Sequence, residues 1–410
     1  MSPNQAFKPT FMKSHEHGLT LALAVIELLY ALIYVCHNSK ENYVDDLQMK
    51  DLLKEVLQQR EAFESAKVKC GIIGLSGAGK SSLINAIAGE KIAPVGSTEQ
   101  TMEAQSYFHE GIEFVDLPGC GTQKWPQSTY IQDLKLETYD CFVIVTNTRL
   151  YEADIFLHKE LKIKRSKPCF ISRSKIDVAI HDEAHDNQLS EEQTLNKIRA
   201  NILTSVSPES SEVYLTSARH PAKWDLAKLI EDIGLSQAGI KRDRFIAGVA
   251  AWSKSALEKK RVVARKIVSW AAVASAANGL NPIPLADVAV DVGVLTAMCK
   301  KINAIYGLSS EQLAYIETAA PNLSKSAEFT GIKQNVLKWA AKYAVAEGIM
   351  AVLKSMGKKV VIKNVAKFLP FIGNIISAGI GYKMTTAFGE QYLDEAEEHA
   401  ERILQKVVSD

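Results

Sequence analysis

A glycine-rich segment near the start of the chain has the residue types of a phosphate-binding loop. Gly74–Ser81 spells Gly-x-x-x-x-Gly-Lys-Ser, between the apolar run Val68–Ile73 and a helical pattern from Ser82 onward. In that context, glycines let successive backbone N–H groups turn toward a polyphosphate, and the following helix adds its positive end. Lys80 would contact the terminal phosphates, and Ser81 would contact a magnesium ion carried by the nucleotide. The residues expected around the phosphates are Gly74, Ser76, Gly77, Ala78, Gly79, Lys80, Ser81 and Ser82.

A second pattern, Asp116-Leu-Pro-Gly119, comes directly after the apolar run Ile112–Val115. An aspartate at the end of a strand can hold a magnesium ion through a water molecule, and the N–H of Gly119 can sense a γ-phosphate. Asp116 and Gly119 are therefore predicted to contact the nucleotide and its metal ion.

Threonines that lie between these two patterns offer a further metal contact. Residues 96–101, Gly-Ser-Thr-Glu-Gln-Thr, can close over the magnesium ion. We choose Thr101 because it precedes the next strand-like segment at the expected distance, and Thr98 is the alternative. Release of this segment after loss of the γ-phosphate would be the order–disorder switch of GTPases. The predicted metal residues are Ser81, Thr101 and Asp116, and the predicted catalytic residues are Lys80, Ser81 and Thr101.

The segment Ser174-Lys175-Ile176-Asp177 carries the signal for the base. It matches the guanine-specific Asn/Thr-Lys-x-Asp element, in which the aspartate accepts the ring N–H and the exocyclic amine of guanine. Adenine presents an acceptor at the ring position and would leave the Asp177 carboxylate poorly paired. Lys175 would lay its aliphatic stem along the base. Ser174 replaces the usual Asn or Thr, and it keeps a hydroxyl group.

A fourth motif, Thr216-Ser-Ala-Arg219, follows another strand-like run. It matches a loop whose backbone, at Ser217 and Ala218, touches the guanine carbonyl. Four motifs in this order, each at the end of a strand, predict that the chain binds GTP and GDP together with Mg²⁺. An ATPase is the alternative, because Ser174 departs from the guanine pattern.

Cys120 stands directly after the Asp116-Leu-Pro-Gly119 pattern. Many small GTPases place a glutamine there, which positions the attacking water. A thiol orients water poorly, so we predict slow hydrolysis by the monomer. The missing groups would come from a second molecule that pairs across the nucleotide, or from the nucleotide itself.

These motifs require a sheet that brings several strand ends together. Apolar runs recur along the chain with helical stretches between them, at 68–73, 112–115, 141–145, 169–171 and 213–215. This alternation predicts an α/β P-loop fold, in which helices flank a mostly parallel sheet and ligands bind at the carboxyl ends of the strands.

A change in composition predicts a second domain. From about Ala247 onward the chain is alanine-rich and helical, without strand signals. We predict an N-terminal helical region at 1–66, a P-loop GTPase domain at 67–246 and an all-helical domain at 247–410, to which the N-terminal helices add.

Two segments raise the question of a membrane. Leu19–Val35 is apolar apart from Glu27, but spanning a bilayer takes about 20 apolar residues, so a buried helix and a membrane-inserted helix both stay open. Residues 348–389 contain six lysines and no Asp or Glu, with Lys359, Lys363 and Lys367 on one helical face. Such a helix can lie on an anionic membrane surface or can pack in a core with its lysines solvated.

The composition indicates the class of protein and the cellular compartment in which it occurs. The 410 residues are 47% hydrophobic and 23% charged, which is typical of a globular or membrane-associated chain of more than one domain. The net charge of +1 gives no reason to expect nucleic acid as a partner. Six scattered cysteines without Cys-x-x-Cys pairs predict buried thiols in a reducing, cytoplasmic compartment.

Several stretches together resemble the immunity-related GTPases: GLSGAGKSS, TEQTME, FVDLPGCGT, WPQSTYIQDLKLETYDCFVIV and SRSKIDVAIHDEA. The resemblance implies a GTPase domain on a helical domain built from both chain ends, and self-assembly on a membrane driven by nucleotide state. Lys80 places the chain with the lysine-bearing members of that family. Residues 281–307 resemble instead the C-terminal helical domain of bacterial Era-like, membrane-associated GTPases.

The sequence as a whole predicts a switch protein that binds and hydrolyses GTP. We expect it to form a homodimer or oligomer across the GTPase domain, and to face the cytosol at a membrane or in solution. The alternative is a GTP-binding scaffold with negligible hydrolysis, whose nucleotide state a partner protein reads.

Overall fold

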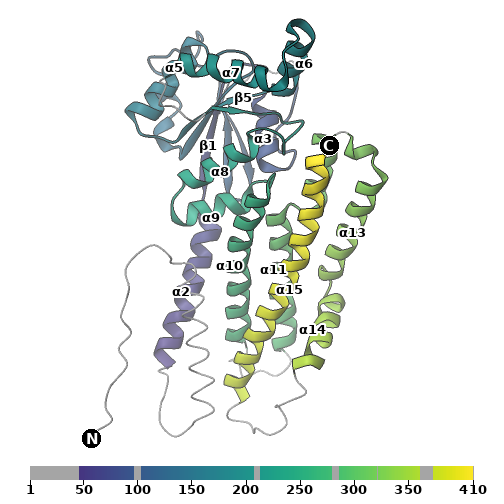
Figure 1. Ribbon diagram of the computed structural model, residues 1–410. Helices are drawn as coiled ribbons and strands as arrows, with labels where there is room; N and C mark the ends of the chain where they lie inside the picture. The colour runs from purple at the N-terminus through teal and green to yellow at the C-terminus, as the bar shows by residue number, and fades with distance from the viewer. Residues whose placement is uncertain are drawn as a thin grey trace, which may run out of the picture.

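A sheet covered by helices lies at one end of the molecule, and a set of long helices extends from it (Figure 1). The computed structural model describes residues 46–96, 103–206, 213–278, 286–320, 322–360 and 373–409. Predictions that concern Leu19–Val35, Thr98, Thr101, Lys363 or Lys367 lie outside these residues.

Six strands form the sheet, in the order β2-β3-β1-β4-β5-β6. They are β1 (Val68–Ile73), β2 (Gln105–His109), β3 (Ile112–Asp116), β4 (Cys141–Thr146), β5 (Cys169–Arg173) and β6 (Val213–Leu215). Every neighbouring pair is parallel except β2 and β3, which are antiparallel. All residues of β4 are buried, as expected for a central strand covered on both faces. The predicted mostly parallel sheet with flanking helices is therefore confirmed.

The edge strand β2 has no counterpart among the predicted apolar runs. Most of its residues are exposed, since it pairs with β3 on one side only, and it therefore lacks the continuous apolar pattern of the buried strands. Glu110 and Gly111 join β2 to β3, both with positive φ (44° and 82°), as in a tight hairpin turn.

Helices cover both faces of the sheet. They are α3 (Lys80–Ala88), α4 (Tyr130–Asp133), α5 (Glu152–His158), α6 (Ile176–Asn187), α7 (Glu191–Ser205), α8 (Leu226–Ser236) and α9 (Gly239–Gly248), with a 3₁₀ turn at Leu136–Thr138 and a π-helical turn at Lys159–Lys164. Successive residues of a strand point to opposite faces of the sheet. Ile72 belongs to the core shared with α3 and α8, whereas Ile73 belongs to the core shared with α4 and α5.

The remaining helices form the helical part of the chain. They are α2 (Asp46–Ser65), α10 (Lys254–Asn278), α11 (Ala286–Tyr306), α12 (Ser310–Ala319), α13 (Ala327–Tyr343), α14 (Ala346–Val360) and α15 (Gly373–Ser409), with a 3₁₀ turn at Leu323–Lys325. The core on the α3 side of the sheet continues into this part. The N-terminal α2 joins it, because the Phe63 and Trp270 rings lie 5.2 Å apart and Lys301 pairs with Glu64. The predicted helical C-terminal part is confirmed, and among the described residues α2 is the N-terminal helix that packs against it.

The longest helix, α15, packs closely along α10 (Figure 1). A side chain at Gly389 would place its Cβ 2.4 Å from Val268 Cγ1, so only glycine allows this approach. Arg261 of α10 forms an ion pair with Asp394 of α15 at 2.6 Å. The two helices therefore form the centre of the helical part.

Among the described residues, no helix is both long and apolar enough to cross a membrane. The first half of α14 buries Ile349 and Val352 in the helical core. The apolar side of that half is therefore occupied by the protein itself.

The described cysteines are all buried, and none of them forms a disulfide with another: Cys70, Cys120, Cys141, Cys169 and Cys299. This agrees with the prediction of buried thiols. Cys36 lies outside the described residues.

A junction segment, Val249–Ser253, connects α9 to α10 and caps the end of α3. The indole N–H of Trp252 donates to the carbonyl oxygen of Ala86 at 2.8 Å, and the N–H of Ala250 donates to that of Ile87 at 2.8 Å. The last carbonyls of a helix have no partner within the helix. The junction segment therefore supplies these partners and fastens α3 to the helical part.

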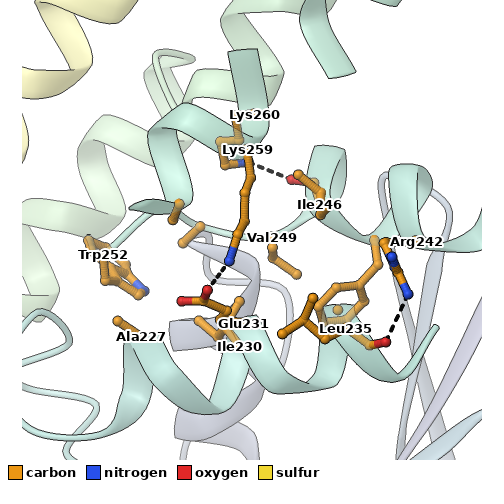
Figure 2. A pocket seen from close by; sticks show the side chains of 14 residues that line it. Ala227, Ile230, Glu231, Leu235, Arg242, Ile246, Val249, Trp252, Lys259 and Lys260 are labelled. Carbon is orange, nitrogen blue, oxygen red and sulfur yellow. Dashed lines mark hydrogen bonds and ion pairs between the residues drawn. The ribbon is translucent and has the colours of Figure 1, made fainter. Parts of the chain in front are cut away.

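A small pocket lies between α8, α9 and α10 beside the junction segment (Figure 2). Its volume is about 40 Å³, and Trp252 and Lys260 are among its lining residues. Lys260 is fully buried and donates to the carbonyl oxygen of Ile246 at 2.9 Å (Figure 2). Ligand sites for drug-sized molecules measure about 300–1,000 Å³. This pocket is therefore too small for a nucleotide.

Candidate functional site

The predicted phosphate loop connects β1 to α3. At Gly74 a side chain is impossible, because its Cβ would lie 2.2 Å from the carbonyl oxygen of Val145 in β4. Gly79 has φ +94° and is the residue that precedes the first turn of α3. Both positions need glycine for a physical reason. The loop therefore curls over the N-terminus of α3, as the sequence predicts.

Lys80 is the first residue of α3 and is only 5% exposed. Its ammonium nitrogen donates to the carbonyl oxygens of Gly74 at 2.9 Å and of Leu75 at 3.2 Å. The same nitrogen lies 3.6 Å from Asp116 Oδ1. The loop thus holds a buried positive charge directly beneath its backbone, where it can attract phosphate oxygens.

Ser81 and Asp116 meet at the carboxyl ends of β1 and β3. The Ser81 hydroxyl donates to Asp116 Oδ2 at 3.5 Å, and Asp116 is 3% exposed. Hydroxyl and carboxylate oxygens are the ligands that Mg²⁺ prefers, and Mg²⁺ is held in such sites by few protein groups plus phosphates and water. In the described ranges, no cluster of three or more His, Cys, Asp or Glu could hold a metal ion by itself. The pair fits a magnesium ion that arrives with a nucleotide.

The segment 174–177 lies against the phosphate loop. The Ser174 hydroxyl contacts the carbonyl oxygen of Ala78 in that loop and that of Thr146 at 3.2 Å. Lys175 has φ +54°, and its ammonium group donates to the carbonyl oxygen of Gly77 at 2.8 Å. Asp177 follows in the first turn of α6, half-buried. The Ser174 hydroxyl therefore links this segment to the phosphate loop, which explains how serine can replace the usual Asn or Thr.

The fourth motif lies beside this segment. The N–H of Ile176 donates to the carbonyl oxygen of Thr216 at 3.2 Å, and the Thr216 hydroxyl lies 2.8 Å from that of Ser172. Ser217 is 1% exposed and Ala218 is half-buried. The two predicted base-binding motifs are thus joined at the carboxyl ends of β5 and β6.

Comparison with known proteins decides the family. A family model described as Interferon-inducible GTPase (IIGP) matches residues 35–407. The chain belongs to this family. It is therefore a GTPase that binds guanine nucleotide, and the resemblance to immunity-related GTPases is confirmed.

Relatives of this chain match it over most of its length. Interferon-gamma-inducible GTPase 10 of Mus musculus is 24% identical over 358 residues, which are 84% of this chain and 82% of that protein. Interferon-inducible GTPase 5 of Rattus norvegicus is 25% identical over 379 residues, 88% of this chain and 80% of that protein. Among solved structures, Era of Aquifex aeolicus covers 53% of this chain and 69% of its own, with 18% identity and a TM-score of 0.31.

Arg173 lies beside the base-binding segment of this GTPase but outside the four nucleotide-binding motifs. It ends β5, is 7% exposed and donates through Nη1 to the carbonyl oxygen of Ser174. Burial lowers the pKa of Arg173 to about 10. An arginine at the end of an otherwise uncharged, buried strand is the signal that could have identified it. Its contact supports the backbone turn that carries Lys175.

Cys120 of this GTPase lies in the core beneath the Asp116–Gly119 loop. The thiol is 7% exposed, and burial, together with the nearby charge of Asp154, raises its pKa to about 11. At neutral pH the thiol is therefore protonated and neutral. A buried, protonated thiol is a poor group for activating or orienting an attacking water.

The other predicted residues lie around the same loop. Ser76 and Gly77 are exposed at its tip, Ala78 is buried, and Ser82 is half-buried in the first turn of α3. Gly119 lies close to the loop, because a Cβ there would be 3.5 Å from Leu75 Cδ2. The structure thus brings together all the predicted contact residues that it describes.

Replacing Ser174 with alanine is expected to weaken GDP binding about tenfold, which corresponds to the loss of one buried hydrogen bond. The reason is the tether to Ala78, which aligns the base-binding segment with the phosphate loop. Titration with a fluorescent GDP derivative measures the change. Ser205→Ala, which removes a hydroxyl that donates to the carbonyl oxygen of Asn201 one turn earlier in α7, is the control. Equal affinities for the native chain and Ser174→Ala would contradict the tether.

Proposed function

We propose that this chain is a GTP-driven switch that hydrolyses GTP slowly as a monomer, is activated by self-association, and acts at the cytosolic surface of a membrane. The observation that carries the proposal is the pairing of the phosphate loop and its buried Lys80 with a buried, neutral thiol at Cys120. One molecule can hold GTP, but at that position it offers no group that orients the attacking water.

In the proposed reaction, a water oxygen attacks the γ-phosphorus. The bond from that phosphorus to the oxygen bridging the β- and γ-phosphates breaks, and the water proton goes to the released phosphate. Lys80 neutralises charge that develops on the β- and γ-oxygens. Ser81, Asp116 and, by prediction, Thr101 would hold Mg²⁺, which supplies further charge neutralisation when bound. Asp177, Ser217 and Ala218 select guanine.

Exposed apolar side chains next to the nucleotide site support self-association. Leu75 in the phosphate loop and Tyr151 at the start of α5 are 38% and 40% exposed. The start of α5 adjoins the loop after Asp116, since a Cβ at Gly121 would lie 3.5 Å from Ala153 Cβ. Aromatic and aliphatic side chains are favoured anchors of protein interfaces. A second molecule seated there would also exclude water from the phosphates.

Activity and molecular size test activation by self-association. Turnover per molecule is expected to rise with protein concentration, and light scattering is expected to show larger particles with a slowly hydrolysed GTP analogue than with GDP. Flat specific activity over a hundredfold concentration range, together with one size in both states, would contradict the proposal.

A GTP-binding scaffold with negligible hydrolysis is the alternative that the buried Cys120 thiol also permits. Steady-state phosphate release separates it from the enzyme. Release no faster than that of a Lys80→Ala variant at every protein concentration would favour the scaffold.

Action at a membrane is proposed on the sequence of Leu19–Val35 and of the lysine-rich stretch 348–389. Flotation of the full chain with vesicles that contain anionic lipid is the test. Binding is expected to weaken with salt, because lysines that neutralise anionic headgroups are screened. A chain that stays unbound in both nucleotide states would contradict this part of the proposal.

A further inference from the structure

Tyr130, which lies outside the four nucleotide-binding motifs, contacts the loop that was predicted to sense the γ-phosphate. It is the first residue of α4 and is 0% exposed. Its hydroxyl donates to the carbonyl oxygen of Pro118 at 2.5 Å. Pro118 lies between Asp116 and Gly119, so the tyrosine holds the middle of that loop from the core side.

The hydrogen bond from Tyr130 to Pro118 also determines the orientation of the Gly119 N–H. The carbonyl of Pro118 and the N–H of Gly119 belong to the same peptide group, which is planar and trans, as are all the described peptide bonds. In a trans peptide group the oxygen and the hydrogen point in opposite directions. A hydrogen bond that holds the Pro118 oxygen toward Tyr130 therefore directs the Gly119 N–H away from the core.

The phosphate loop lies near Gly119. A Cβ at Gly119 would approach Leu75 Cδ2 within 3.5 Å, and Leu75 supplies a carbonyl to Lys80. We propose that Tyr130 is a positioning residue for the γ-phosphate: its hydroxyl fixes the peptide plane of Pro118 and Gly119 and so aims the Gly119 N–H at that phosphate. The inference rests on the proposed function, because it concerns the step that distinguishes GTP from GDP.

The donor is permanent under physiological conditions. Tyr130 belongs to the core formed with Ile73, Leu117 and Cys120. Burial there raises its pKa well above the usual value, and the nearby Cys120, Tyr139, Asp116 and Asp154 act in the same direction. The phenol thus keeps its proton, and no change in its contact with Pro118 is expected between pH 6 and pH 9.

A role confined to stability would have a different signature. Loss of a purely structural hydrogen bond would weaken binding of GDP and of GTP alike, because the whole domain would be affected. A positioning role affects only ligands with a γ-phosphate, since GDP has none for Gly119 to contact. The ratio of the two affinities therefore separates the two roles.

The test is Tyr130→Phe in the full chain, which keeps the ring and removes the hydroxyl. GDP affinity is expected to stay within about twofold of the native value. Affinity for a slowly hydrolysed GTP analogue and the single-turnover rate of GTP hydrolysis are each expected to fall about tenfold, as for the loss of one aligned hydrogen bond. Tyr139→Phe is the matched control, because Tyr139 is a buried tyrosine of the same core that lies before β4. It is expected to change neither the ratio of the analogue affinity to the GDP affinity nor the rate of GTP hydrolysis.

Other outcomes would overturn the assignment. An unchanged analogue affinity, or equal losses for GDP and the analogue in a folded variant, would show that Tyr130 does not position Gly119. Should Tyr130→Phe fail to fold, 3,5-difluorotyrosine at position 130 replaces it. That residue keeps the phenol as a stronger donor, so the analogue-to-GDP affinity ratio is expected to rise, and an unchanged or lower ratio would overturn the inference. A native chain that binds neither nucleotide would overturn the proposed function and this assignment together.

Discussion

Replacing Lys80 with alanine is expected to lower the single-turnover rate of GTP hydrolysis about 100- to 1,000-fold, the range seen when one preorganised donor to a developing negative charge is removed. The ammonium group is buried at the N-terminus of α3 and is held by the Gly74 and Leu75 carbonyls. In the free protein it also lies 3.6 Å from Asp116 Oδ1. Its loss removes a buried positive charge from the phosphate site and leaves the Asp116 carboxylate buried without that partner.

Lys91→Ala is the matched control for this prediction. Lys91 is exposed just beyond the other end of α3, so its removal changes the net charge equally but leaves the phosphate loop intact. Rates from rapid-quench assays, with thermal unfolding to check that both variants are folded, provide the measurement. A folded Lys80→Ala chain that hydrolyses GTP within threefold of the native rate would contradict the role assigned to Lys80.

The phosphate site could be predicted from the sequence because its constraints are local. Gly74 must be glycine because of a carbonyl oxygen 2.2 Å from its would-be Cβ, and Gly79 because of a positive φ. Such requirements determine which residue types occur at which spacings, so they can be recognised in the sequence. The largely apolar runs of β1 and β4 could likewise be recognised, because strands buried on both faces are mostly apolar, with Lys69 and Thr146 as the polar exceptions.

The supports of the site could not be predicted, because they depend on pairings between distant parts of the chain. Ser174 looks like a weak match in the sequence, yet its hydroxyl reaches Ala78 across the fold. Arg173 and Tyr130 each bond a carbonyl of a predicted motif, and carbonyl acceptors leave no residue-type signal in the acceptor segment. The exposed edge strand β2 was missed for a related reason, since only one of its neighbours is a strand.

Trp252→Ala is expected to lower the free energy of unfolding by about 3–5 kcal/mol, as for other buried aromatic side chains truncated to alanine. Trp252 is 5% exposed and lies beside the small pocket between α8, α9 and α10. Its indole N–H also caps the carbonyl oxygen of Ala86 in the last turn of α3. The variant therefore combines a new cavity with a buried acceptor that has lost its donor. Denaturant unfolding followed by circular dichroism measures the loss.

Two further variants separate the causes of this loss. Trp252→Phe keeps most of the packing and removes the N–H, so it is expected to cost about 1–3 kcal/mol, the penalty for an unsatisfied buried acceptor. Trp224→Ala removes a half-buried tryptophan from the part of the chain that contains the sheet, where its N–H donates to the exposed Glu191 carboxylate. Its expected loss of unfolding free energy is less than half of that for Trp252→Ala. Equal losses for Trp252→Ala and Trp224→Ala would mean that the junction segment does not fasten α3 to the helical part. If the prediction is correct, the helix that begins at Lys80 depends for its stability on the segment that leads into α10, which contacts its other end.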